Sequence, residues 1–451
     1  MGRTTLSVCL IVRDEARMLP GCLESVAGVA DQLVVVDTGS TDDTTSIARS
    51  FGAEVHHFAW IDDFSAARNE SIRHATETWI LWIDADERLL EHSVEPLRSL
   101  LVVPARPTIY QVQIRNLQAD RHSYTLSMSH RLFSRHPKIQ FSGRIHEQVH
   151  PSLKAAGGEE KSSQVILEHE GYALDKAGLK AKFRRNQPLL EAQVAEEPDS
   201  GYAHYTLGQN YALMGDPQAA LHEYVRAMDL KEFSGASLAT VLNAAAEACW
   251  QLDRLAEAEN YAAESIQLVP RQSSGNFIMY RVMRSREDPA GQIRYLSAVL
   301  SQPQEGAVTG GSDLPKDILI PRQHLLYSLG ELQLANEDPA SAERVLRECL
   351  TLKPDSQQAM TLLTKALAQQ GKWEGILQAL ADLPQPPSSE SRGIIGTALI
   401  KLQRFPEAVD HYRAWLDDEP DYEGLRERLA GLYAKVGDRA AAESLLRGGS
   451  P

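Results

Sequence analysis

The chain has 451 residues, of which 43% are apolar and 24% are charged. This length exceeds what one hydrophobic core usually serves, so two or three domains are expected. The formal net charge of -15 argues against nucleic acid or an anionic membrane as the main partner, because both require basic patches.

The cysteines and the first apolar run bear on the compartment. Cys9, Cys22, Cys249 and Cys349 form no C-x-x-C pair and lie in apolar segments, which favours buried reduced thiols and a cytoplasmic protein. The run Leu6–Val12 is too short for a membrane span, and Arg-Asp-Glu follows it rather than a small-residue cleavage site. We therefore expect neither a targeting signal nor a membrane span.

The N-terminal half alternates strand and helix patterns. Such units imply a parallel sheet with right-handed crossovers. No G-x-G-x-x-G follows the first strand, which argues against a dinucleotide-binding oxidoreductase. Strands are predicted at Leu6–Val12, Gln32–Asp37, Glu54–Phe58 and Trp79–Ile83, with helices at Leu19–Val29, Asp43–Ser50 and Phe64–Ala75.

The strand Trp79–Ile83 ends at two carboxylates, Asp84 and Asp86. In open α/β sheets, ligands bind beyond the carboxyl ends of the strands. On alternate residues of an extended chain, the two carboxylates would point to one side and could share a divalent cation with a diphosphate. The alternative interpretation is a strand that ends in a solvated acidic turn.

From Thr108 onward the apolar residues alternate, which predicts mainly antiparallel strands. The sheet would then be mixed, with parallel strands on a nucleotide side and these strands on an acceptor side. The predicted strands are Thr108–Ile114, Ser123–Ser129, Arg131–Phe133, Gly143–His150 and a last one at Val165–Tyr172.

The C-terminal half reads as repeated helix–turn–helix units. The spacing of small and large residues is similar to that of the tetratricopeptide repeat, with small residues at Gly208 and Ala220 and a large one at Tyr224. The frame recurs about every 34 residues, and a loop is expected at 302–317. Such arrays offer a concave groove for peptides or proteins. One irregular helical bundle is the alternative.

The N-terminal motifs resemble those of family 2 glycosyltransferases of the GT-A fold. The segment Gly143–Glu147 and the helical tail make the chain similar to the subgroup that includes the sublancin-type peptide S-glycosyltransferases. The resemblance implies an α/β GT-A domain with a Rossmann-like mixed sheet over 1–175, a connecting helix at 176–197 and an all-α tetratricopeptide solenoid over 198–451. The motifs that carry it are Leu6–Glu15, Val36–Asp42, Asp63–Asn69 and Asp84–Glu87.

The resemblance also implies a nucleotide-sugar donor, usually a UDP-sugar, with Mg²⁺ or Mn²⁺. Asp86 matches the carboxylate that ligates the metal, and Asp84 the one nearer the ribose or the metal. Asp37 matches the pocket for uracil and ribose, although it could instead cap its turn. Arg68 matches a basic residue near the phosphates, unless it is a solvated helix residue, and Arg13 could act similarly.

The resemblance assigns roles to three further residues. Glu147 matches the base that takes the acceptor proton, with a structural ion pair as the alternative. His146 could line the acceptor site, ligate metal or simply pack. In relatives a histidine about twenty residues past the base completes the metal shell, and His169 has that spacing; a histidine with only structural bonds is the alternative.

The leading hypothesis is a metal-dependent inverting glycosyltransferase. It would modify a Ser, Thr or Cys side chain of a peptide or protein presented by the repeats, such as a flagellin or a small secreted peptide. One alternative keeps the transferase but assigns a glycan or lipid acceptor, with the repeats used for oligomerisation, and we also consider a homodimer. The other alternative is a non-catalytic repeat scaffold.

Overall fold

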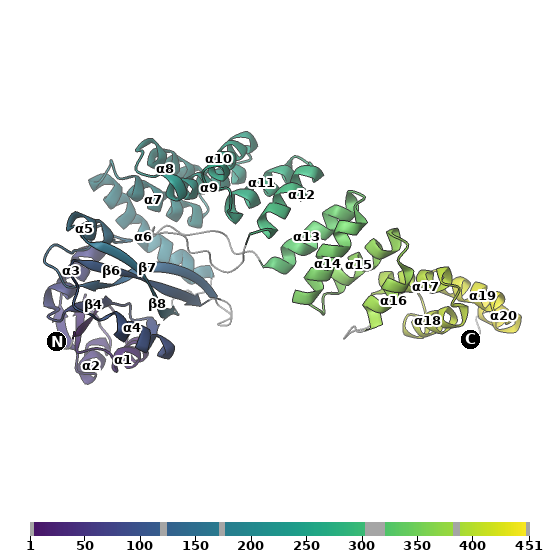
Figure 1. Cartoon of the computed structure of the whole chain (residues 1–451), viewed down its shortest axis with the longest axis horizontal. Helices are drawn as coiled ribbons and strands as arrows, with labels where there is room; N and C mark the ends of the chain where they lie inside the picture. The colour runs from purple at the N-terminus through teal and green to yellow at the C-terminus, as the bar shows by residue number, and fades with distance from the viewer. Residues whose placement is uncertain (1–3, 118–123, 171–175, 303–320, 382–387, 448–451) are drawn as a thin grey trace. The chain divides into compact units, whose positions relative to one another are not determined.

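The computed structural model describes residues 4–117, 124–170, 176–302, 321–381 and 388–447. By its internal contacts the chain divides into two compact units, and the seam lies between Ile278 and Met279. The first unit contains a mixed sheet and the helices that follow it, and the second is helical (Figure 1). Nearly all of the loop expected at 302–317 lies outside the described residues. Within them, each helix is too short or too polar to cross a membrane.

The described part of the sheet has eight strands in the order β3-β2-β1-β4-β7-β6-β8-β5. Strands β1 to β4 run parallel to one another, whereas β7 is antiparallel to both β4 and β6. The predicted mixed sheet is therefore confirmed. The strands are β1 (Leu6–Val12), β2 (Gln32–Asp37), β3 (Glu54–His57), β4 (Trp79–Trp82), β5 (Glu87–Leu89), β6 (Thr108–Leu117), β7 (Tyr124–Ser134) and β8 (Glu159–His169).

Helices cover both faces of this sheet, which explains why its first strands read as continuous apolar runs. On one face Leu10 packs with Leu23 in a core of fully buried side chains. On the other face Cys9 and Trp82 pack with Phe141 and Leu153. The helices among these strands are α1 (Leu19–Val26), α2 (Thr44–Ser50), α3 (Phe64–His74), the 3₁₀ turn η1 (Glu91–Ser93), α4 (Val94–Leu100) and α5 (His150–Ala155).

The strand predicted at Gly143–His150 is wrong. Gly143 and His146 have φ angles of 96° and 53°, and left-handed residues of this kind break an extended chain. The segment forms a loop in which Ser142 and Gln148 pair as an isolated antiparallel bridge. Conversely, β8 begins at Glu159 and is longer than the predicted last strand.

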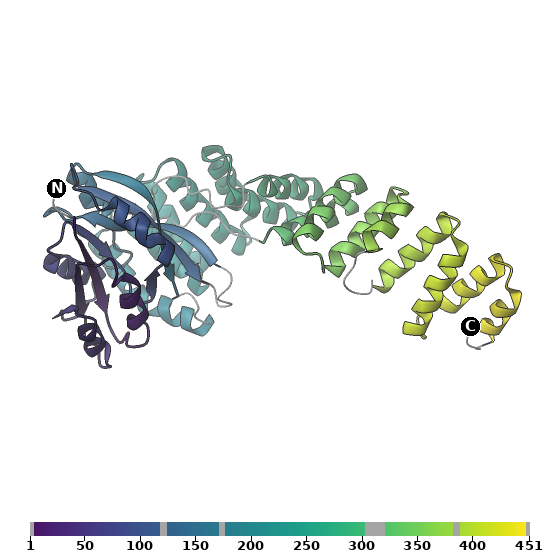
Figure 2. The ribbon, with the colours of Figure 1, turned by 60° about the horizontal axis from the view of Figure 1, so that its bottom comes forward.

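A long helix, α6 (Lys176–Glu196), follows the sheet, and helical pairs come after it. Figure 2 shows the helices of the second unit lying side by side in successive pairs. The first unit continues with α7 (Gly201–Met214), α8 (Pro217–Asp229), α9 (Gly235–Gln251), α10 (Leu255–Leu268) and α11 (Ser273–Ser285), in which the seam falls. The later helices are α12 (Pro289–Leu300), α13 (Arg322–Ala335), α14 (Pro339–Leu352), α15 (Gln357–Gln369), α16 (Trp373–Ala381), α17 (Ser389–Lys401), α18 (Phe405–Asp418), α19 (Leu425–Lys435) and α20 (Arg439–Leu446).

Small residues set how closely paired helices approach, as the repeat pattern predicts. A Cβ atom added at Gly208 would lie 2.7 Å from Tyr224, and one added at Gly396 would lie 2.3 Å from Tyr412. Each glycine therefore leaves room for a large side chain on the partner helix sixteen residues later. The second helix of several pairs begins with an aspartate whose side chain accepts a hydrogen bond from the first turn, as at Asp216.

Two glycines of the second unit make a matched test of this packing. Gly396→Ala should lower the free energy of unfolding by about 1–3 kcal/mol, because the new methyl group overlaps the Tyr412 ring. Gly431→Ala, within α19, meets no atom within 4 Å and should raise it by about 0.5–1 kcal/mol through helix propensity. Urea unfolding followed by circular dichroism would measure both. Equal effects would contradict the packing role of Gly396.

Candidate active site

The predicted donor residues follow three neighbouring strands. Strand β1 pairs in parallel with β2 on one side and with β4 on the other, so the strand order reverses direction beside β1. Such a switch point is where open α/β sheets bind ligands, at the carboxyl ends of the strands. Arg13, Asp37 and Asp84 follow or end β1, β2 and β4 respectively, and all three belong to this edge.

The backbone at Asp84 and Asp86 is not extended, which corrects the geometry expected for this pair. The Glu87 amide donates to the Asp84 carbonyl over 3.0 Å, which closes a turn. The Glu87 carboxylate accepts from the Asp84 amide over 3.0 Å, which holds the same turn from the other side. Asp84 and Asp86 consequently face different partners.

Asp84 faces two buried guanidinium groups. Arg68 on α3 donates to Asp84 Oδ1 over 2.8 Å, and Arg131 on β7 lies 3.4 Å from Asp84 Oδ2. Both guanidinium groups also lie against the Trp82 indole, at 3.9 Å and 3.4 Å from the ring centroid. Arg131 donates in addition to the fully buried Glu87 over 2.6 Å.

Arg68 also connects Asp84 to the predicted base. Its Nε atom donates to Glu147 Oε1, while its NH2 group binds Asp84. Arg68 is only 6% exposed, so the alternative of a solvated helix residue is wrong. Its hydrogen bonds go to protein carboxylates, so phosphate binding by Arg68 stays an untested prediction.

Two guanidinium groups serve three carboxyl groups in this cluster. The two guanidinium groups of Arg68 and Arg131 face the three carboxylates of Asp84, Glu87 and Glu147. Burial alone would raise the pKa of Asp84, but Arg68 and Arg131 more than offset it and hold that pKa below its usual range. Burial raises the pKa of Glu87 to about 7, against the opposing effect of Arg131.

Asp86 and His169 form a separate pair. His169 Nε2 lies 3.1 Å from Asp86 Oδ2, and its Nδ1 lies 2.9 Å from Asn116 Oδ1. Burial lowers the pKa of His169, but the Asp86 carboxylate outweighs it, so this pKa lies above its ordinary value. When His169 is neutral, the Asn116 oxygen accepts from Nδ1 and so keeps the imidazole proton on that atom. Nε2 then faces Asp86 without a proton, which is the arrangement that metal-binding histidines use.

The donor set of this pair fits one side of a divalent cation site. A separation of 3.1 Å between nitrogen and oxygen is what bonds of about 2.0–2.2 Å to one shared ion require. Within the described ranges, no group of three or more His, Cys, Asp or Glu side chains is arranged to hold a metal alone. Any further ligands would therefore come from substrate or water, as is usual for Mg²⁺.

Asp37 is buried at the end of β2 and holds its own turn. Its carboxylate accepts from the Ser40 amide over 3.0 Å and lies 3.1 Å from His57 Nδ1. Burial raises the pKa of Asp37, but the bonds from Ser40 and His57 outweigh it and leave the pKa lowered. Asp37 thus caps its turn, and its predicted contact with uracil and ribose stays untested. Arg13 is exposed at this edge.

The loops after β1 and β2 are linked by hydrogen bonds that the sequence did not predict. Asp14, with a left-handed φ of 54°, accepts from the Thr41 amide over 2.7 Å. Its own amide donates to the Ser40 hydroxyl over 2.9 Å.

The next residue, Glu15, has its pKa raised to about 7 by burial and by the charges of Asp86 and Asp84. Glu15 therefore lies among other carboxyl groups at this edge, and their charges disfavour its ionisation.

The sequence interpretation also missed Arg131 and Glu87. Glu87 belongs to the Asp84–Glu87 motif and Arg131 to a predicted strand, but the sequence pattern predicts no role for either. The available signal was a charged residue in the apolar strand run Arg131-Leu132-Phe133, because a buried charge requires a partner. Exposed His146, by contrast, lies beside Glu147 in the loop, and its predicted roles stay open.

Comparison with known proteins agrees with this architecture. Residues 7–153 match the model of glycosyl transferase family 2, and residues 323–356 match a tetratricopeptide repeat. A TPR repeat-containing protein of Synechococcus elongatus is 39% identical over 221 residues, covering 48% of this chain and 54% of that protein. The SPbeta prophage-derived glycosyltransferase SunS of Bacillus subtilis is 28% identical over 219 residues, covering 48% and 51%.

The chain spans about half the length of these curated relatives. The match to the family model covers the sheet from β1 to α5, including the turn at Asp84 and the loop of Glu147. The repeat match covers α13 and α14. The chain thus carries a glycosyl transferase family 2 domain followed by tetratricopeptide repeats.

Proposed function

We propose that the protein is a metal-dependent inverting glycosyltransferase that moves a sugar from a nucleotide donor, a UDP-sugar, to a side chain of a peptide or protein. The observation that carries this proposal is the bridge of Arg68 between Asp84 and Glu147. It brings a candidate base next to the edge of the sheet where family 2 domains are expected to bind their donor. The match of residues 7–153 to that family supports the assignment.

On the donor side, Asp86 and His169 would hold a divalent cation together with the donor diphosphate. Bound there, the cation would neutralise negative charge that develops on the leaving diphosphate. The acidic surroundings of Glu15, Asp84 and Asp86 would otherwise repel a diphosphate, so they favour a cation between the two. In this arrangement Asp84 serves to hold Arg68 and Arg131 rather than to ligate the ion.

On the acceptor side, Glu147 would act as the general base. As an acceptor oxygen or sulfur attacks the anomeric carbon, its proton passes to the Glu147 carboxylate, and the bond from carbon to the nucleoside diphosphate breaks. One displacement of this kind inverts the anomeric configuration. The ion pair with Arg68 orients the carboxylate beforehand, which removes part of the entropic cost of the reaction.

The proposed acceptor is a Ser, Thr or Cys side chain. The tetratricopeptide repeats support a macromolecular acceptor, because such arrays bind peptides and proteins along extended surfaces. Binding energy from parts of the acceptor remote from the reacting group would orient that group at Glu147.

The metal assignment is tested by Asp86→Asn. Loss of the ligating charge should lower hydrolysis of UDP-sugars by at least about 100-fold, since the stabilisation at stake is several kcal/mol. Calorimetry should show that UDP binding no longer depends on Mn²⁺. Asp253→Asn is the matched control, because this exposed aspartate is left-handed and asparagine tolerates that conformation. Full wild-type activity after metal stripping with EDTA would refute the metal-dependent mechanism.

The base assignment is tested by Glu147→Gln, which keeps the shape of the side chain and removes its basicity. Turnover should fall by roughly 10²–10⁴-fold, while the affinity for UDP with Mn²⁺ should stay unchanged. Single-turnover rates and calorimetry separate the two effects. A decrease of less than about tenfold would exclude Glu147 as the base, and His146→Ala would then be the next variant to measure.

The acceptor assignment is tested by ending the chain at Gln302, which removes α13 to α20 and keeps all of the first unit that precedes the seam. The shortened chain should hydrolyse UDP-sugars at close to the full-length rate, because the sheet has its own core. Transfer of labelled sugar to proteins of the source organism should be lost. Equal labelling by both chains would show that the removed repeats do not present the acceptor.

A further inference from the structure

Glu147, the candidate general base, lies on a short loop whose two ends are joined by hydrogen bonds. The Ser142 amide donates to the Gln148 carbonyl, and the Gln148 amide to the Ser142 carbonyl, each over 2.9 Å. These two bonds join the ends of the segment, called here the 142–148 loop. Its tip contains the left-handed residues Gly143 and His146, and Glu147 follows directly.

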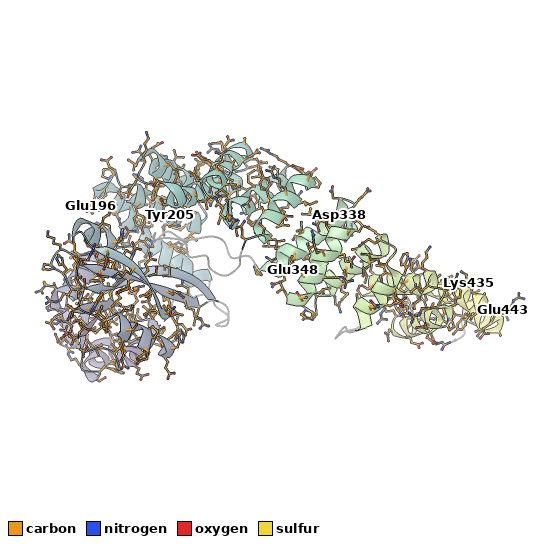
Figure 3. The ribbon with its side chains drawn as sticks, viewed as in Figure 1. Glu196, Tyr205, Asp338, Glu348, Lys435 and Glu443 are labelled. Carbon is orange, nitrogen blue, oxygen red and sulfur yellow. The ribbon has the colours of Figure 1, made fainter. Side chains whose placement is uncertain are left out.

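One side of the 142–148 loop is held by α6, the helix that links the sheet to the repeats. Arg144 Nε donates to Glu196 Oε2 over 2.6 Å, and its NH2 group binds the other carboxylate oxygen. The Ile145 amide lies 3.4 Å from Gln193 Oε1. Glu196, labelled in Figure 3, is at the C-terminal end of α6, and Gln193 is one helical turn before it.

Apolar packing reinforces these polar contacts. Ile145 is 5% exposed and lies in a cluster with Leu189 and Leu190 of α6 and Leu207 of α7. The helix also comes so close to the loop that a Cβ atom added at Gly143 would lie 3.2 Å from Gln193 Nε2. With a φ of 96°, this position therefore favours glycine both by conformation and by space.

The other side of the loop contacts the start of α3. The Phe64 amide donates to the Arg144 carbonyl over 2.8 Å, and Arg144 NH1 donates to the Asp62 carbonyl over 3.0 Å. Arg68, on the same helix α3, binds Glu147. The 142–148 loop is thus fixed between the helix that supplies Arg68 and the helix that begins the repeat half.

We propose that α6 positions the candidate base, and that Glu196 and Gln193 are positioning residues that act through the 142–148 loop. The inference rests on the proposed role of Glu147. The loop belongs to no strand, so its contacts with α3 and α6 take the place of sheet pairing. A misplacement of about 1 Å can cost on the order of 10²-fold in rate, so loosening α6 should be visible in turnover.

The test uses Glu196→Ala and Gln193→Ala in the full chain. Amide hydrogen exchange at Ser142 and Gln148 should become roughly tenfold faster, while amides of β1 should not change. With UDP-glucose and UDP-N-acetylglucosamine as probes, Mn²⁺ present and water as acceptor, kcat for hydrolysis should fall on the order of ten- to a hundredfold. The KM for the donor and the affinity for UDP should stay unchanged, which a general loss of folding would not produce.

A charge exchange and a control make the test specific. Arg144→Glu alone should have at least the effect of Glu196→Ala, because it also removes the bond to the Asp62 carbonyl. The double variant Arg144→Glu with Glu196→Arg should restore part of both the protection and kcat relative to Arg144→Glu. The control is Glu257→Ala, which removes an exposed ion pair with Arg254 in the same unit. Exposed ion pairs contribute little to global stability. Removing either the Arg144–Glu196 pair or the Arg254–Glu257 pair should therefore leave the protein folded.

The outcomes separate this inference from the proposed function. Unchanged exchange at Ser142 and Gln148 would overturn the inference whatever the activity. Faster exchange with an unchanged kcat would overturn it too, since the loop would then not govern the base. If the wild-type protein hydrolyses neither UDP-sugar, the proposed donor is contradicted, and the exchange measurement still decides whether α6 holds the loop.

Discussion

The buried guanidinium group of Arg68 is the contact on which the geometry of the site depends. A buried charge costs several kcal/mol unless it is paired, and Arg68 meets this requirement with Asp84 and Glu147 while it lies against Trp82. Its two carboxylates come from the end of β4 and from the 142–148 loop, which are far apart in sequence. The need to pair this one guanidinium group therefore fixes the position of Glu147 relative to the carboxyl end of β4.

The same edge holds more carboxyl groups than guanidinium groups, and burial together with this crowding raises the pKa values of Glu15 and Glu87. Arg68 and Arg131 are already engaged by protein carboxylates, so they do not offset the acidity of Glu15 and Asp86. In the proposed mechanism, a divalent cation at Asp86 would relieve this repulsion between carboxyl groups.

The sheet could be predicted from sequence because its signals are local. Apolar runs bounded by turns gave β1 and β2 with their observed ends. His169 lies 3.1 Å from Asp86, although its ligation of a metal, which the family resemblance implies, stays a prediction. The strand prediction for Gly143–His150 was wrong because Ile145 and Val149 alternate with polar residues as in a strand. In the structure Ile145 is buried against α6, whereas Val149 belongs to the core on one face of the sheet. Arg131 was missed because its partners are distant in sequence. Contacts of that range leave no periodic pattern.

The packing of Ile145 against α6 and α7 bears on how such proteins can be recombined. A sheet domain cut free after β8 would lose Gln193, Glu196 and the apolar cover of its own loop. Chimaeras that exchange repeat arrays should therefore join near the seam at Ile278 and carry α6 and α7 with the sheet. The structural module that can be inherited or engineered as one piece is larger than the segment that matches the family model.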